Sequence, residues 1–209
     1  MIPPIAFVTL AAGAFLALLG FIVVKPSMTR DMGGKILAFL ALFVAPGVAM
    51  FAGAHEHLEL STSTKFCLSC HVMEQYGKSL LRDDTEYIPA VHYQNNYVPR
   101  DNACYTCHTD YAMYGTIRSK LRGIRHVVVQ YFGAIPDTIK LYAPYKNREC
   151  LHCHLGARKF EEASAHKEDE WLLTQLKRGE KSCLEPGCHD AAHEVKELAD
   201  ATFWKGVKE

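Results

Sequence analysis

The hydrophobic residues of this chain are concentrated at its N-terminal end. Two runs without a charged side chain, residues 5–24 and 36–54, are each about long enough to cross a hydrocarbon core of roughly 30 Å as a helix. We therefore predict two transmembrane helices. The second run contains Pro46 and Gly47, and because proline lacks an amide hydrogen we expect a kink there.

The short segment between the two runs is basic. Residues 25–35 contain Lys25, Arg30 and Lys35 against one acidic residue, Asp31. Because Lys and Arg are enriched in cytoplasmic loops, this loop is predicted to be cytoplasmic and the chain after Ala54 to lie outside. The chain then divides into a membrane anchor, residues 1–57, and an extracytoplasmic domain, residues 58–209.

The second part lacks the alternating pattern that is typical of β-strands. Proline, glycine and short polar linkers separate brief helical stretches, which predicts a mainly α fold with irregular loops. The tail, residues 193–209, is expected to form a short amphipathic helix that carries Phe203 and Trp204. The formal net charge of +0 gives no indication of a nucleic-acid partner.

All eight cysteines lie in this second part, and six of them follow one strict spacing. Three regular C-x-x-C-H motifs are formed by Cys67, Cys70 and His71, by Cys104, Cys107 and His108, and by Cys150, Cys153 and His154. In a helical turn, residues three and four apart share a face, so both thiols can reach one porphyrin while the histidine turns toward its iron. The motifs therefore predict covalent haem c, and the porphyrin faces would supply a core that the few aliphatic residues cannot.

Disulfides and zinc sites are the competing interpretations. Paired cysteines at this spacing would form tight, strained disulfide loops. Zinc ions could instead be coordinated by four thiolates each. Neither explains why a histidine follows every second cysteine.

The remaining two cysteines form a stretched version of the motif. Cys183 and Cys188 are separated by four residues, and His189 follows the second cysteine. Because Pro186-Gly187 favours a turn, the two extra residues can loop outward while Cys183 returns to the porphyrin. This segment is interpreted as a fourth haem site of the form C-x4-C-H.

The histidine count supports haem iron with two axial ligands. Four of the eleven histidines belong to the motifs, which leaves seven others. Electron-transfer haems need a second strong axial ligand, so at least three of the seven are expected to bind iron.

The order of these motifs resembles the NapC/NirT-type membrane-anchored tetrahaem cytochromes. Residues 90–108, AVHYQNNYVPRDNACYTCH, are similar to the family segment in which a histidine precedes the second motif. Residues 107–135 resemble its basic, aromatic helix, and residues 164–183 and 190–194 resemble the stretches around its fourth motif. The resemblance implies that His92, His166 and His193 are distal ligands of three bis-histidine haems, without assigning which serves which haem.

Within this resemblance, the first haem motif differs from the other three in its candidate iron ligand. Cys70, His71, Val72 and Met73 match a C-H-x-M variant in which the methionine binds iron, so His71 and Met73 both stay open as the ligand. The family has a lysine and an acidic residue beside the quinol pocket at this haem. Lys120 matches the lysine, and His126 lies at or next to the acidic position. His126 is open to three roles: the proton acceptor for quinol, the sixth ligand of the first haem, or a solvent-facing residue.

The resemblance implies electron transfer from menaquinol or ubiquinol in the bacterial inner membrane to a periplasmic oxidoreductase. The family anchor is a single helix, so the predicted second span raises an alternative: a haem wire inside a larger membrane complex, contacting other subunits and lacking a quinol site. A reductase that binds substrate at the open first haem ranks third, because no dedicated catalytic residues lie near it.

Overall fold

The computed structural model describes residues 4–134, 136, 139, 141 and 144–206. The chain forms two compact units, Met1–Thr62 and Ser63–Glu209, and each is described by itself. The ends of the two predicted parts, residues 1–3 and 207–209, lie outside the described residues. So does Ile135, the last residue of the stretch compared with the family helix.

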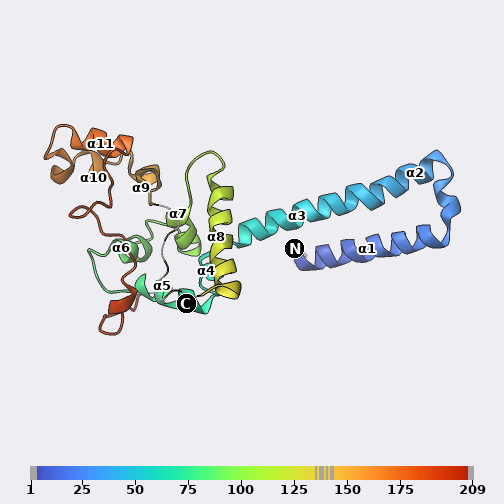
Figure 1. Ribbon diagram of the computed structural model, residues 1–209, viewed down its shortest axis with the longest axis horizontal. Coiled ribbons are helices and arrows are strands. Elements are labelled where there is room, and N and C mark those ends of the chain that lie inside the picture. Colours follow the sequence, from blue (N-terminus) through green and yellow to red (C-terminus); the bar gives the residue numbers. More distant parts are fainter. Residues whose placement is uncertain (1–3, 135, 137–138, 140, 142–143, 207–209) are drawn as a thin grey trace. The chain divides into compact units, whose positions relative to one another are not determined.

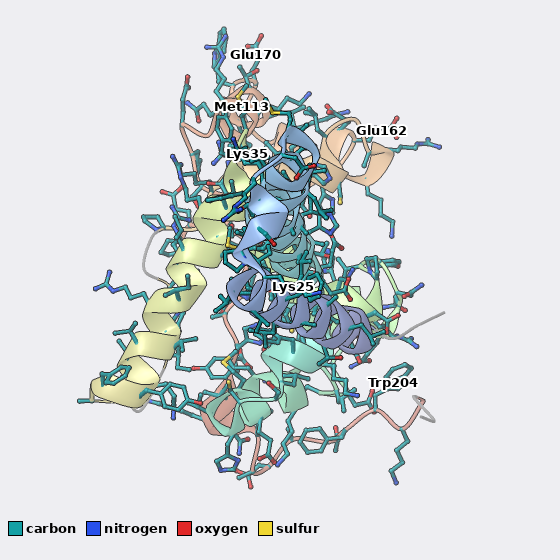
Figure 2. The ribbon with its side chains drawn as sticks, turned by 90° about the vertical axis from the view of Figure 1, so that its right-hand side faces the viewer. Lys25, Lys35, Met113, Glu162, Glu170 and Trp204 are labelled. Carbon is teal, nitrogen blue, oxygen red and sulfur yellow. The ribbon has the colours of Figure 1, made fainter. Side chains whose placement is uncertain are left out.

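The first unit is a helical hairpin (Figure 1). Its elements are α1 (Pro4–Val24), the 3-10 turn Pro26–Thr29, α2 (Met32–Phe39), a π-helical turn (Leu40–Val44) and α3 (Ala45–Leu60). Helices α1 and α3 lie side by side. The apolar side chains of this hairpin, including Leu16, Phe43 and Phe51, are largely exposed, as expected for helices that contact lipid. Lys25 and Lys35, labelled in Figure 2, flank the turn between α1 and α2.

Within the described residues, one helix is long and apolar enough to cross a bilayer. It is the continuous segment Met32–Leu60, 29 residues long, with a mean hydropathy of 2.3 over its most apolar window. It begins four residues before the predicted run and ends six residues after it, at the first polar segment that precedes the cysteine motifs. Helix α1 contributes a shorter apolar stretch, Ala12–Val24, so the two-pass topology stays a prediction.

The helix changes its winding at the predicted proline site. The π-helical turn Leu40–Val44 ends immediately before α3, whose first turn contains Pro46. Because Pro46 has no amide hydrogen to donate, the preceding turn loses one helical hydrogen bond, and a wider turn accommodates this without ending the helix.

The second unit consists of short helices joined by loops, as the sequence predicts. Its α-helices are α4 (Thr64–Cys67), α5 (Glu74–Ser79), α6 (Ile88–Gln94), α7 (Ala103–His108), α8 (Gly115–Phe132), α9 (Asn147–His154), α10 (Arg158–Glu161) and α11 (Leu172–Arg178). The 3-10 turns are His71–Met73, Arg100–Asn102, Ser164–Lys167 and Val195–Glu197. Among the described residues there is no strand, only one isolated bridge between Arg82 and Phe203.

This unit has little core made of protein side chains. Its cluster of buried residues contains Phe160, Leu176 and Cys183, with four partly buried neighbours around it. A domain of this size normally buries a larger apolar core. The thin core agrees with the expectation that porphyrin faces complete it.

Over its described residues, 193–206, the tail does not form the amphipathic helix expected from the sequence. After the 3-10 turn and the bend that follows it, the amide of Trp204 donates to the carbonyl of Leu81 (2.8 Å), and the amide of Asp83 donates to the carbonyl of Thr202 (2.8 Å). The Arg100 guanidinium lies 5.4 Å from the centre of the Trp204 ring. The helix prediction was wrong because pairing with the segment around Arg82 satisfies the backbone instead.

Helix α8 begins at a close backbone approach. Tyr114 precedes it in the left-handed region, with φ of 63°. Gly115 is buried, and a Cβ atom at this position would meet the carbonyl oxygen of Asp110 at 1.6 Å. Only glycine fits here without displacing the loop that follows the second cysteine motif.

We predict opposite effects for two glycine-to-alanine substitutions in α8. Gly115→Ala should lower the free energy of unfolding by about 2 kcal/mol or more, because the new methyl group overlaps backbone. Gly123→Ala adds a methyl group with nothing within 4 Å and should stabilise the helix by up to about 1 kcal/mol. Thermal unfolding of the haem-loaded protein in detergent, followed by circular dichroism, measures both. Equal transition temperatures for the two variants would contradict the close approach at Gly115.

Candidate functional site

The four cysteine motifs adopt three kinds of local structure. Helix α7 contains the whole second motif, and α9 contains the whole third motif. The first motif starts at the end of α4 and continues into the 3-10 turn His71–Met73. The fourth motif is a loop, as its longer spacing requires.

The first cysteines of the motifs come together in pairs. The thiols of Cys67 and Cys104 are hydrogen-bonded, and this bond, assisted by the charge of Lys120, lowers the pKa of Cys67 to about 7 against the opposing effect of burial. Cys150 and Cys183 form the same kind of pair, which lowers the pKa of Cys183 to about 7. The first motif therefore adjoins the second, and the third adjoins the fourth.

One buried polar side chain fixes each of these pairs. Thr64 donates its hydroxyl to the carbonyl of Arg100 (2.6 Å) and accepts from the amide of Ala103 (2.9 Å), beside Cys104. Asn147 donates to the carbonyls of Leu176 (2.8 Å) and Lys181 (2.7 Å), and its oxygen accepts from the amide of Cys183 (2.9 Å).

Sequence reasoning missed both Thr64 and Asn147. A signal was present, because each lies three residues before the first cysteine of its motif. In isolation, however, a threonine or an asparagine at the start of a short helix reads as an ordinary helix-capping residue.

The fourth motif closes on itself in the predicted way. Gly187 has φ of +88°, the left-handed conformation that favours glycine. The amide of Cys188 donates to the carbonyl of Glu185 (2.9 Å), and the amide of His189 donates to the carbonyl of Cys183 (3.0 Å). In a helical C-x-x-C-H motif the histidine amide bonds the carbonyl four residues earlier, at the first cysteine. The longer loop restores the same relation between first cysteine and histidine.

Six histidines form three facing pairs that join motif residues to the predicted distal residues. The ring centres of His92 and His154 are 6.0 Å apart, those of His108 and His193 are 6.1 Å apart, and those of His166 and His189 are 6.0 Å apart. Two metal–imidazole bonds of about 2 Å each, plus the distance from each bonded nitrogen to its ring centre, separate two ring centres by roughly 6 Å. All three spacings suit an iron atom between the rings.

The three predicted distal histidines are also oriented by hydrogen bonds. The Nδ1 of His92 lies 2.9 Å from the carbonyl oxygen of Ile88, and the Nδ1 of His166 lies 2.9 Å from that of Phe160. The Nδ1 of His193 lies 2.8 Å from the hydroxyl of Ser79, which itself donates to Tyr76. Each acceptor holds a proton on Nδ1 and leaves the Nε2 lone pair available for a metal.

Burial keeps His193 neutral. It lowers the pKa of His193 to about 4, with a further contribution from the charge of His108. Ser79, the residue that bonds His193, is fully buried. A neutral imidazole with a free Nε2 is the form that binds iron.

The first motif is arranged differently from the other three. The side chain of His71 is 96% exposed and its Nδ1 lies 3.2 Å from the Glu74 carboxylate. Met73 is half-buried. Of the four motif histidines, the three others face a partner histidine, whereas His71 points into solvent beside an acidic side chain.

Lys120 lies at this first motif. Its Nζ is 4.5 Å from the centre of the Tyr105 ring, and its charge acts on Cys67. The hydroxyl of Tyr105 is buried without a hydrogen-bond partner. Lys120, Tyr105 and Cys67 therefore form a small polar group, of which the sequence singled out Lys120 and Cys67 but not Tyr105.

His126 lies on a different flank of α8 from Lys120. Six residues separate them, and at 3.6 residues per turn their side chains point in different directions. His126 is half-buried, and burial followed by the charge of Arg125 lowers its pKa. His108 is exposed by its surface area, but the surrounding atoms of the unit desolvate its ring, and this desolvation, followed by the charge of His126, lowers the pKa of His108. His126 therefore lies near the second motif.

A buried ion group ties the second motif to the third. The Asp110 side chain is 2% exposed, and its carboxylate lies 2.7 Å from Arg148 and 3.6 Å from Arg118. Arg148 belongs to α9 and Arg118 to α8, so one carboxylate holds three segments. Breaking such a buried pair leaves an uncompensated charge and is costly.

Cysteine–histidine motifs beside facing histidines define the class of c-type cytochromes. The sequence profile of the NapC/NirT cytochrome c family, N-terminal region, matches residues 30–198, and the chain belongs to that family. It is therefore a cytochrome c with covalently bound haem, from a family of membrane-anchored electron-transfer proteins.

Curated relatives share about a quarter of their residues with this chain. It is 24% identical over 181 residues to the cytochrome c-type protein TorC of Escherichia coli K12, covering 79% of this chain and 44% of TorC. It is 26% identical over 196 residues to NapC of Paracoccus pantotrophus, covering 85% and 76% of the two chains. For NapC of Haemophilus influenzae the identity is 23% over 197 residues, covering 84% and 86%. The chain thus spans less than half the length of TorC, and no solved structure matches it.

We predict that Asn147 is required for the joint between the third and fourth motifs. Asn147→Leu removes three hydrogen bonds in a buried setting and should lower the free energy of unfolding by about 3 kcal/mol. The fourth motif should also lose haem, because Cys183 is no longer held. Chemical denaturation and the intact mass measure the two effects.

Asn95→Leu is the matched control. Asn95 is exposed and bonds only locally, to the carbonyl of Val91. Its substitution should change stability by no more than about 0.5 kcal/mol and leave the haem content intact. Equal losses in the two variants would refute the role assigned to Asn147.

Proposed function

We propose that this protein is a membrane-anchored tetrahaem cytochrome that transfers electrons from the membrane quinol pool to a periplasmic redox partner. The three facing histidine pairs carry the proposal. Each pair joins one motif histidine to one distal histidine at the spacing that an iron atom requires. Its anchor would cross the bacterial inner membrane twice, with residues 25–35 cytoplasmic and the cysteine motifs in the periplasm.

On this proposal, the facing histidines would be the axial ligands of three haems. His108 and His193 would hold the second haem, His154 and His92 the third, and His189 and His166 the fourth. Filling both faces excludes substrates from the iron and limits rearrangement during electron transfer. The eight motif cysteines, two for each haem, would provide the covalent attachment, and bound haem supplies the one-electron redox chemistry.

For the first haem we propose Met73 as the axial ligand in place of His71. Met73 is half-buried, whereas His71 faces solvent and contacts Glu74. A thioether ligand raises the potential of haem iron relative to imidazole. A first haem with a higher potential accepts electrons readily, which suits the entry point of the chain.

Lys120 and Tyr105 support a quinol site beside the first haem. Quinol oxidation releases two protons with two electrons, so the electron acceptor needs polar groups beside it that bind the hydroxyls and accept protons. The Lys120 ammonium and the unpartnered Tyr105 hydroxyl lie next to Cys67, where they could bind the quinol oxygens. His126, on the flank near His108, would receive a proton at a later step.

The second candidate is a haem-wire subunit of a larger membrane complex without its own quinol site. The predicted second span favours it, because additional spans commonly pack against other membrane subunits. The two candidates differ in one property: a wire is not reduced by quinol when it is purified alone.

We predict that a quinol analogue reduces the purified, haem-loaded protein and that Lys120→Ala slows this reduction by at least about tenfold. His126→Ala should slow it too, through loss of proton acceptance. Stopped-flow spectroscopy of the haem absorbance measures the rate. Lys159→Ala, which removes an exposed lysine from α10, is the control and should leave the rate unchanged. No reduction of the wild-type protein would favour the wire instead.

A further inference from the structure

The apolar side chains of α8 form an exposed stripe on one face of the helix. Spacings of three and four residues place them on the same side. The stripe consists of Ile117, Leu121, Ile124, Val128, Tyr131 and Phe132, whose exposure runs from 49% for Val128 to 88% for Phe132. At 1.5 Å per residue the stripe is roughly 23 Å long, far more than the scattered single apolar residues of a soluble surface.

Basic residues border this stripe, and acidic residues do not. The sequence of α8, GTIRSKLRGIRHVVVQYF, contains four Lys or Arg residues and no Asp or Glu. Arg118 and Arg125, seven residues apart, lie along one border of the stripe, and Lys120 lies along the other. Met113 and Tyr114, just before the helix, are 83% and 76% exposed, and Met113 is labelled in Figure 2.

The opposite face of α8 is fixed to the haem-motif unit. The amide of Asp110 donates to the hydroxyl of Ser119 on this face (2.9 Å), and Arg118, at the border of the stripe, lies 3.6 Å from the Asp110 carboxylate. Gly115 lies against the carbonyl of Asp110. These contacts hold the first turns of the helix and leave the stripe uncovered. In Figure 2, side chains extend outward along α8, drawn in pale yellow.

We propose that α8 lies in the surface of a bilayer that contains anionic phospholipid, with the apolar stripe inserted among the acyl chains. A helix with an apolar face and bordering cations is the arrangement that binds at the interface of anionic membranes. The proposal rests on the membrane anchoring described above and does not require that quinol is oxidised.

The charge pattern favours lipid over a protein occupant. A second copy of α8 packed on the stripe would bring Arg118 and Arg125 against like charges. A partner protein would have to match an arginine-bordered stripe with acids along its length, whereas anionic headgroups supply that charge at every position. Tyr131 and Phe132 at the end of the stripe suit the headgroup boundary, where aromatic residues are enriched.

The placement also deepens the proposed function, on which this step rests. Lys120 borders the stripe and lies beside Cys67 of the first motif. With α8 in the interface, Lys120 would stand between the lipid and the first haem. Quinol would then reach this site sideways from the bilayer, without first entering water.

Photo-crosslinking of the full-length, haem-loaded protein tests the inference. Benzoylphenylalanine replaces Ile124 on the stripe or, as the control, Glu170, an exposed residue before α11 that Figure 2 labels. Each variant is reconstituted in vesicles of phosphatidylethanolamine with phosphatidylglycerol and irradiated. We expect a phospholipid adduct in the intact mass at position 124, with a yield at least about fivefold higher than at position 170.

A second variant tests the charge. Arg125→Gln should lower the share of phosphatidylglycerol among the adducts at position 124 by about fivefold, the effect of one charge that contacts a headgroup. Equal lipid adducts at positions 124 and 170, a crosslinked dimer, or a crosslink to a co-purified protein at position 124 would overturn the inference. Quinol reduction is measured separately on the same preparation, so failure of the lipid contact and failure of the quinol site give different results.

Discussion

The hydrogen bond at Nδ1 of each distal histidine is the interaction on which the account of this protein depends. An imidazole on a short helix or loop could turn in many directions, and it would then bind iron poorly or not at all. The carbonyls of Ile88 and Phe160 and the hydroxyl of Ser79 each hold one ring and direct its Nε2 toward a motif histidine. Because the hydrogen-bond acceptors lie in the helices α6, α10 and α5, the fold and the ligand set are fixed together.

A second constraint follows from the small protein core. The haem-motif unit buries few aliphatic side chains, so polar contacts carry much of the positioning that hydrophobic packing provides elsewhere. Thr64, Asn147 and Asp110 are all buried, and each joins one motif segment to another. Such contacts give direction as well as stability, since an unmatched buried donor or charge is costly. Positions that look unremarkable in the sequence therefore decide which motifs are neighbours.

Much of the chemistry, but less of the geometry, could be predicted from the sequence. The C-x-x-C-H spacing is local, so it identifies the cysteines and motif histidines directly. The stretched fourth motif was interpreted through Pro186-Gly187, and its backbone closes as expected. The pairing of His92 with His154, or of His166 with His189, depends on contacts between distant segments and has no local signature.

The tail was predicted as a helix because its periodicity is helical, whereas pairing with residues around Arg82 prevails. Tyr105 was missed because a tyrosine between the two cysteines of a motif carries no functional signal in the sequence. Its importance follows from its buried hydroxyl, which only the structure reveals.

Electron paramagnetic resonance of the oxidised, haem-loaded protein, with and without a quinol-site inhibitor, tests the central claim most directly. Three low-spin signals of the bis-histidine type that ignore the inhibitor, and a fourth signal of different type that shifts with it, are the predicted result. That spectrum follows from three facing histidine pairs and a first motif whose histidine points to solvent. Four bis-histidine signals, all unaffected by the inhibitor, would contradict both the ligand assignment and the quinol site.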